Sequence, residues 1–279
     1  MVNYLNDKER QGLNKKSLYG YRKELYLFLE YSKDKAIFEI DTKHIKSYLR
    51  YREDNFEVKA RSTLGQIRTI IKLFFDWLVE EIIIEKNPVN KINPYIVEPA
   101  VIEALNIQEI KEIQNACETP RERALIEVLL STGCKPGEIV NISLKNINWD
   151  KNTITLGETN KNRVVLLTED AKKYLLKYLE TRTENTDFLF VAGKKPYGKL
   201  SSRSIQREIT KISSKTKISK KISPITFRHT FAKTMLENGH PMYIVQSLLG
   251  HKSYSSTSET YIKVTNDNIR SILKLENIY

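Results

Sequence analysis

Apolar residues recur every three to four positions in three stretches of the first ninety residues, which is the spacing of helices that bury one face. The first stretch covers residues 15–34, and the third runs over about residues 62–81. The second begins at Asp41 or Thr42, because either side chain can cap the first turn of a helix. The Asn-Pro pair at residues 87–88 breaks the pattern, so a small all-α domain is predicted to end there.

The second part of the chain mixes helical spacing with short strand-like runs. Residues 93–104 hold two prolines and no clear period, which predicts a linker between domains at residues 1–92 and 105–279. Apolar runs at 153–156 and 163–167 flank a polar turn and predict a hairpin. The expected fold is mainly α, with a helical N-terminal domain and a C-terminal α+β domain that has a small antiparallel sheet. A further strand is predicted at 188–191, and helices at 106–117, 119–133, 168–181, 227–236 and 242–249.

An excess of positive charge lies mainly in the second part of the chain. The whole sequence carries 46 Lys and Arg against 34 Asp and Glu, a net charge of +12. Residues 101–279 contain 28 basic and 19 acidic residues, whereas residues 1–100 contain 18 and 15. A pI near 9.4 favours a polyanionic partner, although charge alone does not identify that partner.

Cysteine and histidine usage excludes several classes of protein. The two cysteines form neither a disulfide framework nor a CxxC metal pair, and the four histidines are scattered. No metal or other cofactor is therefore expected, and a reduced, cytoplasmic protein is favoured. No apolar run is long enough to span a membrane, and the polar first ten residues do not resemble a signal peptide.

The most basic segment runs over residues 193–221, with ten Lys or Arg and a single acid, Glu208. Ser201 or Ser202 can cap a helix inside it. Its basic residues recur every four positions and form one slanting stripe on that helix. Such a stripe suits the phosphates along a nucleic-acid groove, and a solvated helix face is the alternative. The residues of this basic stripe are Lys199, Arg203, Arg207, Lys211 and Lys215.

Residues 224–261 place an arginine, a histidine and a tyrosine between short helical segments. Arg228 lies in the run FRHTFA, His251 closes the run LLGH, and Tyr261 follows about one short helix later. Each residue alone fits an ordinary structural role. The three pieces in this order, however, closely resemble the second signature box of the tyrosine recombinase (phage integrase) family.

This resemblance implies a site-specific DNA recombinase or integrase whose helical core-binding domain precedes the catalytic domain. In the family, an arginine and histidines hold the scissile phosphate while the tyrosine attacks it and forms a 3′-phosphotyrosyl intermediate. The resemblance therefore implies that Tyr261 is the nucleophile and that Arg228 and His251 stabilise charge on the phosphate. It also implies double-stranded DNA as the partner and a homo-oligomer on DNA, a tetramer when two sites are paired. Because the intermediate keeps the bond energy, the chemistry requires no ATP.

Three positions depart from the family pattern. The run TGCKPGEIV at residues 132–140 resembles the first signature box, but Lys135 stands where the family has its first catalytic arginine. Lysine can pair with a phosphate oxygen, although it lacks the planar fork that grips two oxygens at once. Glu158 replaces the catalytic lysine of the hairpin, so Lys161 in the same turn is the candidate for that role. Ile225 replaces a histidine, and isoleucine cannot transfer a proton.

Arg163 and Tyr197 complete the expected DNA-binding residues, the first on the hairpin and the second in a basic loop. The sequence leaves two other functions possible. One is a DNA-binding protein that keeps the recombinase fold but has lost catalysis, and the other is a type IB topoisomerase. The retained Arg228, His251 and Tyr261 favour an active enzyme, and the N-terminal helical domain with the short length favours a recombinase.

Overall fold

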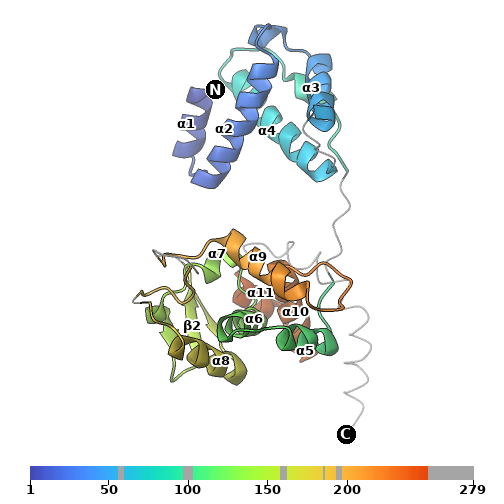
Figure 1. Cartoon of the computed structure of the whole chain (residues 1–279). Coiled ribbons are helices and arrows are strands. Elements are labelled where there is room, and N and C mark those ends of the chain that lie inside the picture. The colour runs from blue at the N-terminus through green and yellow to red at the C-terminus, as the bar shows by residue number, and fades with distance from the viewer. Residues whose placement is uncertain (56–59, 97–102, 158–161, 185, 193–196, 251–279) are drawn as a thin grey trace. The chain divides into compact units, whose positions relative to one another are not determined.

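The computed structural model describes residues 1–55, 60–96, 103–157, 162–184, 186–192 and 197–250. The chain divides into two compact units, Met1–Ala100 and Val101–Tyr279, and each unit has its own hydrophobic core (Figure 1). Within the described residues, every helix is too short or too polar to cross a membrane.

Four helices build the first unit, and aromatic side chains fill its core. Phe28 meets Tyr48 and Phe75 edge to face, and the buried face of the fourth helix packs against the second and third. The predicted all-α arrangement of this unit is therefore confirmed. Its elements are α1 (Val2–Arg10), α2 (Lys15–Tyr31), η1 (Ile37–Glu39), α3 (Thr42–Asn55), α4 (Arg61–Glu80) and η2 (Pro88–Lys91), where η marks a 3₁₀ turn.

Polar side chains define where helices begin in this unit. Asp41 accepts a hydrogen bond from the amide of His44 at 2.8 Å, so Asp41 caps α3 and Thr42 is its first residue. The sequence pattern does not predict α1, because only Tyr4 and Leu5 of its nine residues are buried. Two apolar positions in nine residues are too few to form a helical period.

The second unit combines helices with a small antiparallel sheet, as predicted. Ile154 lies opposite Val165 in the hairpin, and both side chains are buried against the core. The strands β1 (Ile147–Asn148), β2 (Thr153–Leu156) and β3 (Arg163–Leu166) form one sheet in the order β1-β2-β3. The helices are α5 (Ile107–Asn115), α6 (Pro120–Thr132), α7 (Pro136–Ile139), α8 (Glu169–Glu180), α9 (Ser202–Ser213), α10 (Pro224–Glu237) and α11 (Met242–Leu249), with the turn η3 (Leu144–Asn146).

The strand predicted at residues 188–191 is wrong. Among the described residues, this segment makes only two isolated bridges and joins no sheet. Arg182 donates hydrogen bonds to the carbonyl oxygens of Phe188 and Leu189, which occupies acceptors that a neighbouring strand would use. Leu189 and Phe190 are buried in the core, and this burial explains why the segment has the composition of a strand.

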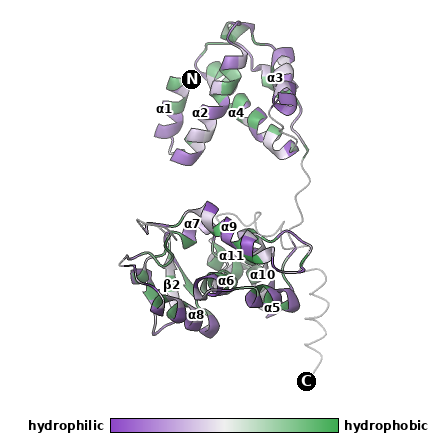
Figure 2. Cartoon of the chain, viewed as in Figure 1, coloured by the Kyte–Doolittle hydropathy of each residue, from purple (hydrophilic) through white to green (hydrophobic). Residues whose placement is uncertain are grey.

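α6 is the central helix of the second unit. It is buried around most of its circumference, which is typical of a helix enclosed by others, and it packs against α8, α9 and α10. In Figure 2 the hydrophobic positions of each unit lie mainly between its helices. α6 ends at Gly133, whose φ is +59°, and a Cβ atom there would lie 2.7 Å from Phe231 and 3.0 Å from Leu249. The end of α6 therefore lies directly against α10 and α11.

Gly133→Ala is expected to lower the free energy of unfolding by about 1–3 kcal/mol, because a positive φ disfavours an L residue and the methyl group would press on Phe231. Gly137→Ala is the matched control, since Gly137 lies in α7 with open space around it and alanine favours a helix. Urea denaturation measures both variants. Equal stability of the two variants would show that the end of α6 accepts a side chain.

Candidate active site

Arg228 joins the ends of two helices. It lies on α10, only 6% exposed, and its Nη1 donates a hydrogen bond to the carbonyl oxygen of Gly133 at 2.9 Å. Its Nη2 donates to the carbonyl oxygen of Leu249 at 2.6 Å. These carbonyls stand at the C-terminal ends of α6 and α11, where main-chain acceptors have no partner within their own helix. The partial negative charge of both helix ends also favours a cation at this place.

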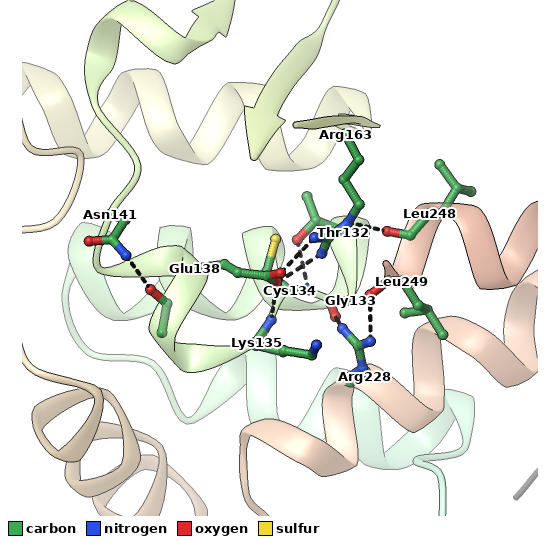
Figure 3. A network of polar contacts seen from close by, with 11 residues as sticks. Thr132, Gly133, Cys134, Lys135, Glu138, Asn141, Arg163, Arg228, Leu248 and Leu249 are labelled. Carbon is green, nitrogen blue, oxygen red and sulfur yellow. Dashed lines mark hydrogen bonds and ion pairs between the residues drawn. The ribbon is translucent and has the colours of Figure 1, made fainter. Parts of the chain in front are cut away.

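Lys135 lies beside Arg228 in the loop that follows α6. It is exposed and directly precedes α7, and Figure 3 shows its ammonium group near the guanidinium of Arg228. Its amide donates a hydrogen bond to Oε2 of Glu138 at 2.7 Å, so the main chain at Lys135 is fixed by a side chain one turn later. The structure thus brings together two cations that the sequence places 93 positions apart.

Arg163 and Glu138 form a two-pronged ion pair next to these cations. Nη1 and Nη2 of Arg163 donate to the two carboxylate oxygens of Glu138 at 2.5 and 2.8 Å (Figure 3). Nε of Arg163 donates to the carbonyl oxygen of Leu248 at 2.6 Å. The guanidinium of Arg163 is thus engaged within the protein through all three nitrogens, and its expected contact with DNA stays a prediction.

Burial and hydrogen bonding oppose each other at Glu138. Burial acts to raise the pKa of its carboxyl group, but the hydrogen bonds from Arg163 and from the Lys135 amide outweigh it, and the pKa is lowered. Burial likewise acts to lower the pKa of Arg163, and the Glu138 carboxylate reverses this effect. Both groups are therefore charged at neutral pH.

These contacts close into a ring that we call the helix-end ring. Arg228 binds the ends of α6 and α11, Arg163 binds the end of α11, and Glu138 connects Arg163 to the loop at Lys135 (Figure 3). Gly250 closes α11 with a φ of +64°, and a Cβ atom there would lie 2.9 Å from Nη1 of Arg163. A side chain at this position would therefore press on that guanidinium.

Glu138 is the residue of this site that the sequence analysis did not assign. The signal that could have revealed it is its position three residues after Lys135, with Pro136 between them. A glutamate at the third residue of a helix commonly accepts a hydrogen bond from the amide that precedes the helix, as it does here.

The first turn of α10 carries no group in place of the family's histidine. Ile225 is 48% exposed there, so its side chain lies at the surface without a titratable group. His229 follows Arg228 on the same helix and is buried. Burial lowers the pKa of His229, and the charge of Arg228 lowers it further, which favours the neutral imidazole.

The basic stripe is divided into a free half and a paired half. Arg203 and Arg207 on α9 are exposed and form no ion pair within the part of the chain that the structure describes. Lys211 instead pairs with Glu122 at 3.0 Å, and Lys215 pairs with Glu118 at 2.8 Å. The basic segment itself contains a single acid, Glu208. The acids that balance Lys211 and Lys215 instead come from residues at and just before the start of α6.

Other expected residues lie near the stripe or outside the description. Lys199 is exposed just before α9, and Tyr197 is partly exposed with a φ of +20°. Tyr261, His251 and Lys161 lie outside the described residues, as does Glu158 at the family's lysine position.

The low pKa of Glu138 predicts an acid-sensitive contribution to stability. A carboxyl group whose pKa is lowered on folding stabilises the protein above its unfolded pKa of about 4.3, and this stabilisation is lost as the pH falls further. Glu138→Gln is therefore expected to cost on the order of 3 kcal/mol at pH 7, because it leaves Arg163 without its counter-charge. The deficit relative to the unchanged protein should shrink below about pH 4.3.

Urea denaturation at pH 7, 5 and 3.5 measures this difference. Asp187→Asn is the matched control, because it breaks an ion pair with Lys145 whose two side chains are 64% and 79% exposed. Its cost should stay below about 1 kcal/mol at every pH. A pH-independent deficit for Glu138→Gln would mean that the carboxylate charge does not stabilise the ring.

Two family profiles match the chain. The profile of the phage integrase family matches residues 103–268, and that of the phage integrase N-terminal SAM-like domain matches residues 2–82. Among curated proteins, the tyrosine recombinase XerC of Leptospira interrogans is 31% identical over 288 residues, covering 98% of this chain and 90% of that protein.

Solved structures show the same fold. The Tn1549 transposon integrase in complex with circular intermediate DNA superposes with a TM-score of 0.76 at 17% identity, covering 97% of this chain and 98% of that one. A lambda integrase tetramer bound to a Holliday junction gives a TM-score of 0.74 at 21% identity, covering 90% of this chain and 76% of that one. Because the sequence identities are only 17% and 21%, these superpositions show the fold alone.

Proposed function

Because the chain belongs to the phage integrase family, we propose that it is a tyrosine recombinase that cuts and rejoins DNA strands at specific sites. The observation that carries the proposal is the meeting of Arg228 and Lys135 where α6 and α11 end. Two cations next to the ends of α6 and α11 suit a phosphodiester, whose non-bridging oxygens carry the negative charge that grows during attack. His251, which directly follows Gly250 in the sequence, is proposed to act with them.

The proposed chemistry assigns one role to each group. The hydroxyl of Tyr261 attacks the scissile phosphorus, the 5′ oxygen of the neighbouring nucleotide leaves, and a 3′-phosphotyrosyl bond forms. Arg228, Lys135 and His251 stabilise the negative charge on the phosphate oxygens. Attack by a 5′-hydroxyl of another strand then breaks the phosphotyrosyl bond and restores the DNA backbone. Lys161 is proposed to deliver the proton to the leaving 5′ oxygen, because Glu158 has no proton to give when ionised.

Lys135 is proposed to act through charge more than through geometry. An ammonium group contacts phosphate as a point charge, whereas a guanidinium matches two oxygens at once. The helix-end ring compensates in part, since Glu138 fixes the main chain at Lys135 and so limits where the ammonium group can reach. Both features support a working site that differs from the family pattern in its details.

The free half of the basic stripe is the proposed phosphate-contacting surface of the second unit. Arg203 and Arg207 are exposed one turn apart on α9, and Lys199 and Tyr197 precede this helix in the sequence. Lys211 and Lys215 contribute less, because Glu118 and Glu122 already neutralise them. Strand exchange joins two DNA sites, so we propose that four protomers assemble on DNA, in the manner named for the lambda integrase tetramer on a Holliday junction.

Tyr261→Phe is expected to abolish the covalent adduct and to leave DNA binding unchanged, because only the attacking hydroxyl is lost. The measurement is a denaturing gel with a nicked suicide substrate made from the DNA that flanks the gene, with a filter-binding assay in parallel. The matched control is Tyr243→Phe, since Tyr243 is exposed on α11 and has no proposed role.

An adduct in the unchanged protein separates the recombinase from an inactive DNA-binding protein of the same fold. An adduct that persists in Tyr261→Phe would move the nucleophile to another residue. Relaxation of supercoiled DNA by the monomer without a second site would instead support a topoisomerase.

Replacing Arg203 and Arg207 by alanine is expected to weaken duplex binding and to reduce the salt slope of log K by about 1.8, or about 0.9 for each lost phosphate contact. The matched control is the double replacement of Lys211 and Lys215, which removes the same formal charge from the paired half of the stripe. Its slope should change by less than half as much. Equal slopes for the two variants would show that α9 contacts DNA along its whole length.

A further inference from the structure

We propose that Arg163 is a positioning residue of the active site and makes no contact with DNA. It holds the last turn of α11, which Arg228 binds, and the loop at Lys135 in one fixed arrangement, so that Arg228 and Lys135 meet the same phosphate. This inference rests on the proposed recombinase function and adds to it a residue that touches neither the phosphate nor the nucleophile.

The geometry of Arg163 uses the whole guanidinium. One edge forms the two-pronged pair with Glu138, and Nε reaches the carbonyl oxygen of Leu248 at 2.6 Å. The side chain is 15% exposed, so these bonds are formed largely away from water and depend little on salt. A lysine could pair with Glu138 or with Leu248 through its single nitrogen, but it could not reproduce the fork.

Arg163 and Arg228 act on consecutive carbonyls. Arg163 takes the carbonyl of Leu248 and Arg228 takes the carbonyl of Leu249, so the two arginines cap the last turn of α11 together. They approach from different elements, since Arg163 is the first residue of β3 and Arg228 lies in α10. The two carbonyls belong to adjacent peptide units of the same helical turn, so a shift of one carbonyl is expected to disturb the position of the next. Loss of Arg163 is therefore transmitted to the contact that orients Arg228.

Arg163 also controls the loop at Lys135 through Glu138. The Glu138 carboxylate accepts both from Arg163 and from the Lys135 amide, so one group connects β3 with the loop after α6. Without Arg163, the half-buried carboxylate would lose its main counter-charge and would be free to turn toward the ammonium group of Lys135. That pairing would withdraw Lys135 from the phosphate.

Gly250 supplies independent support for a tight contact at this point. A Cβ atom added to Gly250 would lie 2.9 Å from Nη1, 3.2 Å from Cζ and 3.3 Å from Cδ of Arg163. The main chain that leaves α11 therefore rests directly on the guanidinium.

The test compares Arg163→Gln and Arg163→Lys with Arg123→Gln. Arg123 is the matched control, because it is 20% exposed, pairs with Glu127 at 2.7 Å and donates to the carbonyl of Gln114, away from the helix-end ring. Three quantities are measured for each variant: the rate of adduct formation in a single turnover at saturating suicide substrate, the salt slope of DNA binding, and the midpoint of thermal unfolding.

A positioning role predicts that Arg163→Gln slows adduct formation by about 10²-fold while the salt slope is unchanged, because misplacement of about 1 Å costs a factor of this size. Arg163→Lys should recover part of the melting temperature and little of the rate, since the charge returns without the fork. Arg123→Gln should lower the melting temperature and leave the rate unchanged. Gly250→Ala, which presses on the same guanidinium, should slow the rate with Arg163 still present.

Three results would overturn the inference. A salt slope reduced by about 0.9 in Arg163→Gln would make Arg163 a phosphate contact. A normal rate in a folded Arg163→Gln protein would leave it a purely structural residue, as would equal rates in Arg163→Gln and Arg123→Gln. The absence of any adduct from the unchanged protein would instead refute the proposed function, so the two failures are distinguishable.

Discussion

The last carbonyl groups of a helix have no partner within the helix, and in the second unit two arginines satisfy them. Arg228 binds the ends of α6 and α11 at once. Arg163 binds the carbonyl of Leu248, one residue before the Leu249 carbonyl that Arg228 binds. Two helices that end at left-handed glycines are thereby drawn to one point. The candidate active site depends on this constraint, because Lys135 follows one of these ends and His251 follows the other in the sequence.

Glu138 makes this concentration of positive charge possible. Burying a guanidinium is costly unless a counter-charge and hydrogen bonds accompany it, and the carboxylate supplies both to Arg163. Glu138 and Arg163 thus form a supporting ion pair beside Arg228 and Lys135, the two cations that are proposed to hold the phosphate.

The basic surface follows the same principle of local balance. Acids at the start of α6 neutralise Lys211 and Lys215, whereas Arg203 and Arg207 remain exposed on the same helix. A net charge of +12 is thus distributed unevenly, even along one stripe. Phosphate binding that depends on released counterions is strongest where the protein has not already paired its cations. The exposed arginines consequently carry more of the proposed DNA affinity than the count of basic residues indicates.

The sequence alone determined the class of fold, the family and most of the described helices, although it missed α1 and placed the start of α10 three residues late. Periodic apolar positions and local caps such as Asp41 act within a few residues, and the signature runs around Arg228 are read directly from the chain. The tertiary structure decided everything that depends on partners distant in sequence. It paired Arg163 with Glu138, paired half of the basic stripe with acids, and placed residues 188–191 outside the sheet. A side chain's charge is fixed by its chemistry, but what that charge binds is fixed by which elements pack beside it.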